Sequence, residues 1–242
     1  MSRYCGDTDA EPILAAAEHW KSTCLLSNSG SIFGESSIWN SENLQHLVTY
    51  FVENLDWGEG SFFQKLQNQL SAAPPSAKLL CAELMWLMLL CPSNIKPPKK
   101  RESIQKIASW GNVSIPNEHP MLSDSSLSGV GSAGTAYNNL RWREMVYVIK
   151  LFEAMFKLSL SDREEILESK DSLAEWLESV PDNDQRQFRH MFLFMLCPDR
   201  AERIFGASDR RRLIAAFRGK KPRDYEGLTA RQLDVELATL RS

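Results

Sequence analysis

Apolar residues recur at intervals of three and four along most of this chain, which is the spacing that places side chains on one face of an α-helix. In the N-terminal half, five segments have this spacing or are apolar almost throughout: residues 11–26, 41–55, 62–70, 76–91 and 102–110. The fourth segment is apolar nearly all round, and a helix of that kind is buried on every side. We therefore expect it at the centre of the core.

After residue 139 the helical spacing returns and continues to the C-terminal residues. It predicts helices over 140–158, from 161 onwards, and over 171–179, 184–197, 208–217 and 229–240. Residues 161–164 and 229–232 have the spacing of a capping box, and Asp184 is the expected cap of its helix. Because no segment alternates in the manner of a strand, the sequence predicts an all-α fold.

Residues 111–139 interrupt the pattern, because they show no helical period and are rich in proline, glycine and serine. Irregular connections longer than about 12–15 residues are mostly functional or disordered. This stretch also separates the two helical halves. We therefore expect an irregular multi-helix domain made of two helical subdomains, 1–110 and 140–242, which a long Gly/Ser-rich loop at 111–139 joins.

The composition is that of an ordinary globular protein, with 43% hydrophobic and 24% charged residues and a net charge of −3. The longest apolar run, residues 79–91, is shorter than the roughly 20 residues that cross a bilayer. The first residues lack the charged-then-apolar order of a secretory leader. We therefore expect a cytoplasmic protein that does not contact membranes.

The five cysteines include no C-x-x-C pair, and the four histidines are isolated from one another. This argues against a disulfide framework and against a metal site. Cys81, Cys91 and Cys197 stand inside apolar runs, where we expect them to be small buried residues. Cys5 stands near the N-terminus, outside any such run.

The glycine-rich residues 128–142, SGVGSAGTAYNNLRW, contain the spacing Gly129-x-Gly131-x-x-Gly134 of a dinucleotide-binding fingerprint. That fingerprint needs a strand to deliver the tight turn, and no strand pattern precedes these glycines. A P-loop needs a lysine where this chain has Thr135. We therefore expect no nucleotide cofactor here. Since the sequence also offers no nucleophile–base or carboxylate pair, we do not expect an enzyme.

Two interpretations of this loop remain open. In the structural one, the glycines permit positive backbone dihedrals and close approach, so that Tyr137 and Trp142 pack over the neighbouring subdomain. In the functional one, backbone amides and nearby polar side chains hold an anion or contact a partner. The residues concerned are Gly129, Gly131, Gly134, Tyr137, Asn138, Asn139, Arg141 and Trp142.

The most uneven charge lies between Asp209 and Asp224, where seven basic residues occur without an acidic one. Such clustering is typical of contacts with nucleic-acid phosphates, whose binding weakens with salt. A solvated face or a docking surface for an acidic partner explains the cluster as well. The residues are Arg210, Arg211, Arg212, Arg218, Lys220, Lys221 and Arg223.

Four segments carry a resemblance to a known family. They are residues 62–92 (FFQKLQNQLSAAPPSAKLLCAELMWLMLLCP), 119–139 (HPMLSDSSLSGVGSAGTAYNN), 186–217 (RQFRHMFLFMLCPDRAERIFGASDRRRLIAAF) and 228–242 (LTARQLDVELATLRS). In this order they resemble the helical region that precedes the motor in McrB-like AAA-family proteins. Those proteins are the nucleotide-driven subunits of modification-dependent restriction systems.

The resemblance covers roughly residues 60 to 242 and implies a module that precedes a GTP- or ATP-hydrolysing ring, in a bacterial restriction or anti-phage setting. The motifs of the AAA motor itself are absent from this sequence. We therefore expect a non-catalytic recognition or accessory module that binds double-stranded DNA through residues 210–223. The alternative is an adaptor that docks a partner nuclease, the AAA motor or a phage protein without binding nucleic acid.

Overall fold

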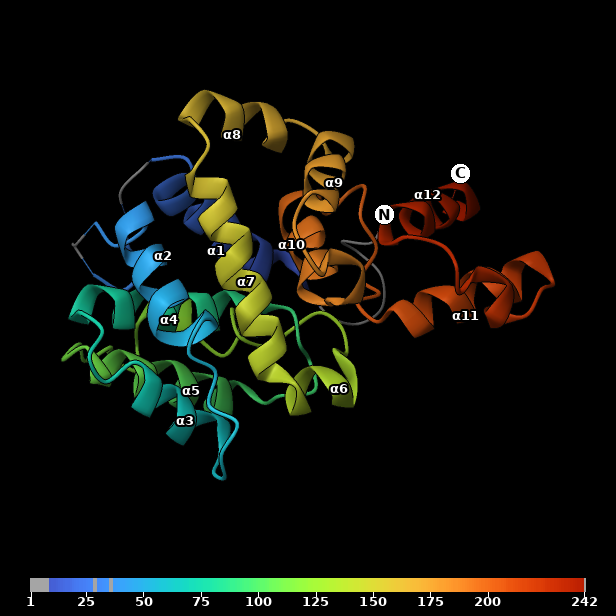
Figure 1. Ribbon diagram of the computed structural model, residues 1–242. Coiled ribbons are helices and arrows are strands. Elements are labelled where there is room, and N and C mark those ends of the chain that lie inside the picture. The colour runs from blue at the N-terminus through green and yellow to red at the C-terminus, as the bar shows by residue number, and fades with distance from the viewer. Residues whose placement is uncertain (1–8, 28–29, 35–36, 242) are drawn as a thin grey trace.

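The computed structural model describes residues 9–27, 30–34 and 37–241, and within these ranges the protein consists of helices α1 to α12 without any β-strand (Figure 1). The all-α prediction is confirmed. Cys5 and the first eight residues, which carry the expectation about a leader, lie outside the described residues.

The first half of the chain forms α1 (Glu11–Trp20), α2 (Ser41–Leu47), α3 (Phe62–Gln69), α4 (Pro75–Leu90) and α5 (Pro97–Trp110). Single π-helical turns, Lys21–Leu25 and Val48–Val52, extend α1 and α2. The second half forms α6 (Gly134–Asn139), α7 (Arg141–Phe156), α8 (Leu160–Leu167), α9 (Lys170–Glu178), α10 (Phe188–Leu196), α11 (Ala207–Arg218) and α12 (Ala230–Arg241). Short 3₁₀ turns are η4 (Pro120–Leu122), η5 (Asn183–Gln185) and η6 (Pro222–Tyr225).

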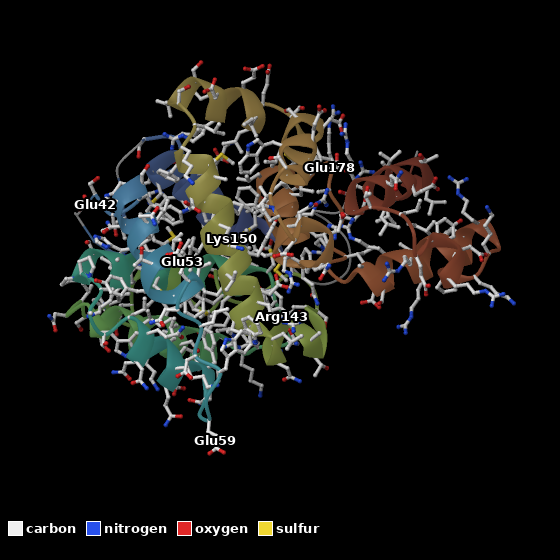
Figure 2. The ribbon with its side chains drawn as sticks, viewed as in Figure 1. Glu42, Glu53, Glu59, Arg143, Lys150 and Glu178 are labelled. Atoms are coloured by element: carbon white, nitrogen blue, oxygen red, sulfur yellow. The ribbon has the colours of Figure 1, made fainter. Side chains whose placement is uncertain are left out.

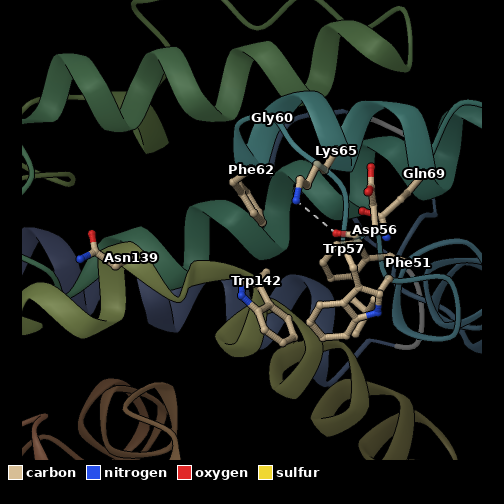
Figure 3. A pocket seen from close by; sticks show the side chains of 10 residues that line it. Phe51, Asp56, Trp57, Gly60, Phe62, Lys65, Gln69, Asn139 and Trp142 are labelled. Atoms are coloured by element: carbon tan, nitrogen blue, oxygen red, sulfur yellow. Dashed lines mark hydrogen bonds between the residues drawn. The ribbon is translucent and has the colours of Figure 1, made fainter.

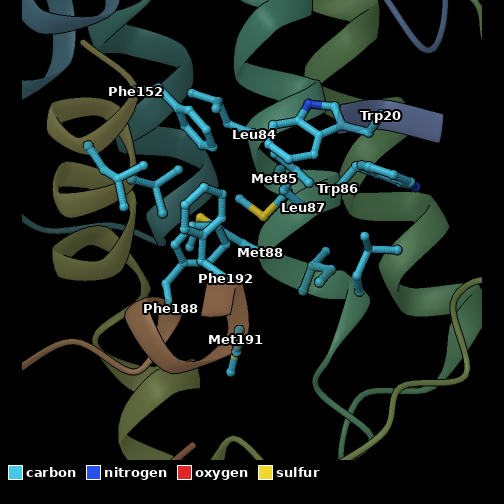
Figure 4. Close-up of a cluster of buried hydrophobic side chains, with 14 of the residues drawn as sticks. Trp20, Leu84, Met85, Trp86, Leu87, Met88, Phe152, Phe188, Met191 and Phe192 are labelled. Atoms are coloured by element: carbon cyan, nitrogen blue, oxygen red, sulfur yellow. The ribbon is translucent and has the colours of Figure 1, made fainter. Parts of the chain in front are cut away.

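Helix α4 lies at the centre of the core, as predicted, because every residue from 79 to 90 is buried. Figure 4 shows Trp20 of α1, Phe152 of α7 and Phe192 of α10 gathered near side chains of α4. The rings of Trp20 and Phe152 meet edge to face with centroids 5.6 Å apart. The core therefore takes side chains from both sides of residues 111–139, and the division into two subdomains stays a prediction.

A second, smaller cluster lies at the C-terminal end of the described chain. It is formed by Ile214 and Ala215 of α11, Tyr225 of η6, and Leu233 and Leu237 of α12. In Figure 1 the two helices extend away from the rest of the molecule, at the right of the view. This unit carries the basic segment that the sequence singled out.

Glu83, in the middle of the apolar helix α4, binds described residues of the chain between α1 and α2. Its carboxylate accepts hydrogen bonds from the amides of Ile32 (2.9 Å) and Phe33 (3.2 Å) and from Nε1 of Trp39 (2.6 Å). Burial raises the pKa of Glu83 to about 7, although these donors act in the opposite direction. A polar residue inside an apolar helix thus holds Ile32, Phe33 and Trp39 in place.

Two helix starts differ from the prediction. Helix α5 begins at Pro97 instead of residue 102, because a proline in the first turn has no amide to satisfy. The capping box before α8 uses Ser159 and Asp162 instead of residues 161 and 164. The box predicted at 229–232 is present, with Thr229 Oγ1 accepting from Gln232 N at 3.2 Å.

The prediction that Asp184 caps the helix ending near Cys197 is wrong. The first amides of α10, those of Gln187 and Phe188, donate at 3.3 and 3.1 Å to Glu144 of α7. Asp184 accepts from Ala230 N at 2.7 Å, at the start of α12. The partners are 43 to 46 residues apart in the chain, so local spacing could not reveal them.

The cysteines within the described residues are free thiols. Cys81 and Cys91 are buried as predicted, and Cys197 is only half-buried. Burial raises the pKa of the Cys81 thiol to about 12, which leaves it protonated and unreactive at neutral pH.

Candidate functional site: a basic C-terminal segment and an aromatic pocket

The basic segment follows α11 and the turn after it. Helix α11 ends at Arg218, and Gly219 adopts a positive φ of 64°, which lets the chain turn sharply into η6. Five of the seven predicted basic side chains are exposed, and Arg211 is half-buried. The exposed ones are Arg212, Arg218, Lys220, Lys221 and Arg223.

Two of these cations lie next to a carboxylate on the protein surface. Arg212 lies 3.6 Å from the carboxylate of Asp209, and Arg218 lies 3.4 Å from that of Glu236. Exposed ion pairs of this kind contribute little free energy, because water and salt screen them. A phosphate can therefore replace these partners at small cost.

Arg210 differs from the rest, and this corrects its assignment as a phosphate contact. Its side chain is 1% exposed and forms an ion pair with Asp234 of α12. Its Nε donates to the carbonyl of Ile204 at 2.6 Å. Arg210 thus faces inward on α11, one helical turn from the buried Ile214, and is not accessible to a phosphate.

Asp234 is the centre of a buried charge network that joins α12 to α10 and α11. Arg189 donates to its Oδ2 at 2.8 Å, and Arg210 pairs with its Oδ1. Burial alone would raise the pKa of Asp234, but the two arginines outweigh burial and hold the pKa well below its ordinary range. The side chain of Asp234 therefore stays ionised as the counter-charge of both arginines.

His190 completes this network as a neutral ring. Burial and the nearby Arg210 and Arg189 lower its pKa well below the usual value, against the opposing effect of Asp234. Its Nδ1 lies 3.1 Å from Nη1 of Arg189. Because an arginine can only donate, Nδ1 is the acceptor in this pair.

The glycine loop is held against the C-terminal end of α4. Val130 N donates to Cys91 O at 2.8 Å, and Ser93 N donates to Gly131 O at 2.8 Å. Gly129 has a φ of +82°, and a Cβ there would lie 2.4 Å from the carbonyl oxygen of Pro92. A glycine is therefore required at position 129 by backbone geometry and by close packing.

The other loop residues divide into buried and accessible ones. Tyr137 is 1% exposed and donates from its hydroxyl to Met88 O at 2.8 Å, so it is not accessible to a partner, which corrects its place among the contact residues. A Cβ on Gly131 would contact Phe205 at 3.0 Å, whereas Gly134, at φ +70°, faces open space. Asn138, Arg141 and Trp142 are half-buried, and Asn139 is exposed.

One pocket brings the glycine loop and the basic segment together. It has a volume of about 420 Å³ and is lined by Gly134 of α6, His190 of α10 and Arg211 of α11, among others. Asp184 and Asp209 line it as well, so its charge is mixed. Gly134 and Arg211, which the sequence singled out for separate reasons, are thus parts of one surface.

A second pocket, the Trp57 pocket, lies between α3, α7 and the loop that precedes α3 (Figure 3). Its volume is about 250 Å³, and its aromatic lining residues are Phe51, Trp57, Phe62 and Trp142. The rings of Trp57 and Trp142 meet edge to face with centroids 5.2 Å apart and an interplanar angle of 84°. Trp142 and Asn139 are the members of this pocket that the sequence singled out.

The sequence missed most of the Trp57 pocket and the whole Asp234 network. A signal for the pocket was present in residues 56–63, DWGEGSFF, where Trp57 lies beside turn-forming glycines between two predicted helices and two phenylalanines begin the second of these helices. For the network no local signal exists, because Arg189 and Asp234 are 45 residues apart.

No group of three or more metal-ligating side chains is found within the described part of the chain. Among these same residues, no helix has the length and apolar character that crossing a bilayer requires.

Comparisons of the chain with protein-family models, with curated proteins and with solved structures gave no match.

Proposed function

We propose that this chain is a non-catalytic helical module of an McrB-like restriction or anti-phage defence system, and that it binds duplex DNA through the basic segment of α11 and η6. The observation that carries this proposal is the exposure of five cations at the projecting end of the molecule. Phosphate contacts of this kind position a protein on DNA without reading its sequence.

Charge placement supports the proposal more than total charge does. The chain as a whole carries a net charge of −3, so a general attraction to nucleic acid is not expected. The turn at Gly219 places Lys220, Lys221 and Arg223 beside the C-terminal end of α11. We therefore expect their charges to act together with that of Arg218 on one side of a duplex.

The test is a fluorescence-anisotropy titration of a labelled duplex at low salt and then at increasing salt. We expect wild-type binding to weaken as salt rises, because bound phosphates release counterions. The triple variant Lys220→Ala, Lys221→Ala, Arg223→Ala should bind at least about tenfold more weakly at low salt. The slope of log K against log salt should fall in magnitude by about 2 to 3, since each lost phosphate contact contributes roughly 0.9.

The matched control removes three lysines outside the basic segment: Lys150→Ala, Lys157→Ala and Lys170→Ala. Lys150 is labelled in Figure 2, on α7. This variant has the same net charge as the test variant, so it should keep nearly wild-type binding if position matters. Absence of binding by the wild type at low salt, or equal weakening in both variants, would refute the proposal. Arg210 is excluded from the test because it is buried.

The alternative function, a protein-interaction adaptor, is favoured by exposed apolar side chains on the same unit. Phe217 of α11 is 72% exposed and Val235 of α12 is 58% exposed. Exposed apolar surface of this kind marks contact sites when it is contiguous. Under this alternative, Phe217→Ala and Val235→Ala abolish co-purification with a motor or nuclease subunit, and DNA has no effect on the protein.

A further inference from the structure

Trp57 exposes 75% of its surface to solvent, although Trp20, Trp39 and Trp86 are fully buried. A tryptophan left in water forgoes the burial of a large apolar surface. Trp57 lies on the loop between the π-helical turn Val48–Val52 and α3, and it forms one wall of the Trp57 pocket. Such a side chain is available for a ligand that offers a flat apolar face.

The other walls provide further aromatic surface. Phe62 and Trp142 face Trp57 in Figure 3, and the buried Phe51 is part of the lining. Because Trp57 and Trp142 meet edge to face, this contact cannot cover both faces of the Trp57 ring. The pocket is therefore suited to a planar ring that stacks on Trp57.

Asp56, Lys65 and Gln69, which line the pocket together with the exposed Asn139, form hydrogen bonds within the protein. Asp56 Oδ1 accepts from Gly58 N at 2.8 Å. Lys65 Nζ donates to the carbonyls of Asp56, at 3.3 Å, and of Gly58. Gln69 Nε2 donates to the carbonyl of Asn54. A ligand would thus be held mainly by ring surface and not by a set of specific hydrogen bonds.

Two arginines lie against rings of the lining, and a lysine lies against the neighbouring Phe63, which is not part of the lining. Arg143 lies over the ring of Trp142 at 5.2 Å, Arg141 lies 5.9 Å from the centroid of Phe62, and Lys106 lies 5.4 Å from that of Phe63. The loop before α3 carries three carboxylates, Glu53, Asp56 and Glu59, of which only Asp56 lines the pocket, and Asp56 is engaged with its own backbone. Cations next to the rings oppose a cationic ligand and favour one that carries phosphates beside its ring.

We propose that the Trp57 pocket binds an unpaired base of a single-stranded nucleic acid, which stacks on Trp57 while the flanking phosphates lie near Arg143 and Arg141. Aromatic platforms with adjacent cations bind single strands in this way, and stacking tolerates any base. The pocket lies near α3 and the start of α7, away from the end of α11 in Figure 1. The inference therefore does not rest on duplex binding by the basic segment.

The experiment compares three fluorescein-labelled probes by anisotropy at low salt: a twelve-residue oligothymidylate, an abasic deoxyribose-phosphate strand of the same length, and a twelve-base-pair duplex. The wild type should bind oligothymidylate more tightly than the abasic strand, because only the former has bases to stack. Trp57→Ala should weaken oligothymidylate binding about 5- to 100-fold, as expected when one stacking contact is lost. Trp57→Phe keeps a ring and should retain most of the affinity.

Controls separate this proposal from the previous one. Trp57→Ala should leave duplex binding unchanged, and its thermal unfolding should match the wild type because the side chain is exposed. The Lys220→Ala, Lys221→Ala, Arg223→Ala variant should keep the difference between oligothymidylate and abasic strand, even if its duplex binding is lost. Equal binding of both single strands by the wild type would overturn the inference. Oligothymidylate binding that Trp57→Ala does not weaken would overturn it as well, because no base would then stack on Trp57.

Discussion

Lys100 carries its ammonium group into the protein interior. The residue is 0% exposed, and its Nζ has no hydrogen-bond partner among the described residues. Burial lowers the pKa of Lys100 from 10.5 to about 8. At neutral pH the Lys100 side chain is therefore still charged, and the folded protein would be more stable with a neutral group at this position.

Replacing Lys100 by methionine should stabilise the protein at pH 7 by up to roughly 3 kcal/mol, since each pKa unit corresponds to about 1.4 kcal/mol. The unfolded chain holds this proton up to a higher pH than the folded chain does. The free energy of unfolding of the wild type therefore increases with pH between about 8 and 10.5. Urea unfolding of both proteins at several pH values should show the advantage of Lys100→Met shrinking above pH 8. An advantage that is independent of pH would contradict this explanation.

At the scale of helices, α11 and α12 are attached to the rest of the protein largely by charge. Their apolar cluster is small and separate from the main core. Asp234 of α12 provides the carboxylate for Arg189 of α10 and Arg210 of α11. Two buried arginines that share one carboxylate depend strongly on it, because removing a partner leaves an uncompensated buried charge.

Asp234→Asn should destabilise the protein by about 3–5 kcal/mol, as loss of one partner of a buried ion pair does. It should also speed proteolytic cleavage after the basic residues of 200–223, because α11 would detach more often. Asp209→Asn is the matched control, since Asp209 is exposed and its pair with Arg212 is long, at 3.6 Å. Urea unfolding and limited proteolysis of both variants measure the difference. Equal stability of the two variants would show that the network does not hold this unit.

At the scale of the whole molecule, one core joins the two halves of the chain. Trp20 and Trp39 from the first half contact Phe152 from the second, at centroid distances of 5.6 and 5.0 Å. Arg163 of α8 donates to Leu25 O at 2.7 Å. Residues 1–110 on their own would expose the faces that Phe152 and Phe192 cover.

We therefore expect residues 1–110 and residues 140–242, produced separately, to lack cooperative unfolding, whereas the complete chain unfolds in a cooperative transition. Exposed core side chains should make both fragments bind hydrophobic dyes. Circular dichroism and tryptophan fluorescence during a urea titration provide the measurement. Cooperative unfolding of residues 1–110 alone would instead support two independent subdomains.

Much of the fold was predictable because helix formation is local. The apolar spacing located most helices, and the continuous apolar run of residues 79–91 located the centre of the core. The candidate site was predictable only in part. Arg210 and Arg212 look alike in the sequence, but two positions on a helix point in different directions, and the face of Ile214 is the buried one.

The sequence by itself determined the helices, the central helix and the excess of positive charge near the C-terminus, because these depend on residues close together in the chain. The tertiary structure decided which groups are accessible. It buried Arg210 and Tyr137, moved the capping role from Asp184 to Glu144, and assembled Trp57 with Trp142. Those outcomes depend on contacts between distant residues, whose partners local periodicity does not specify.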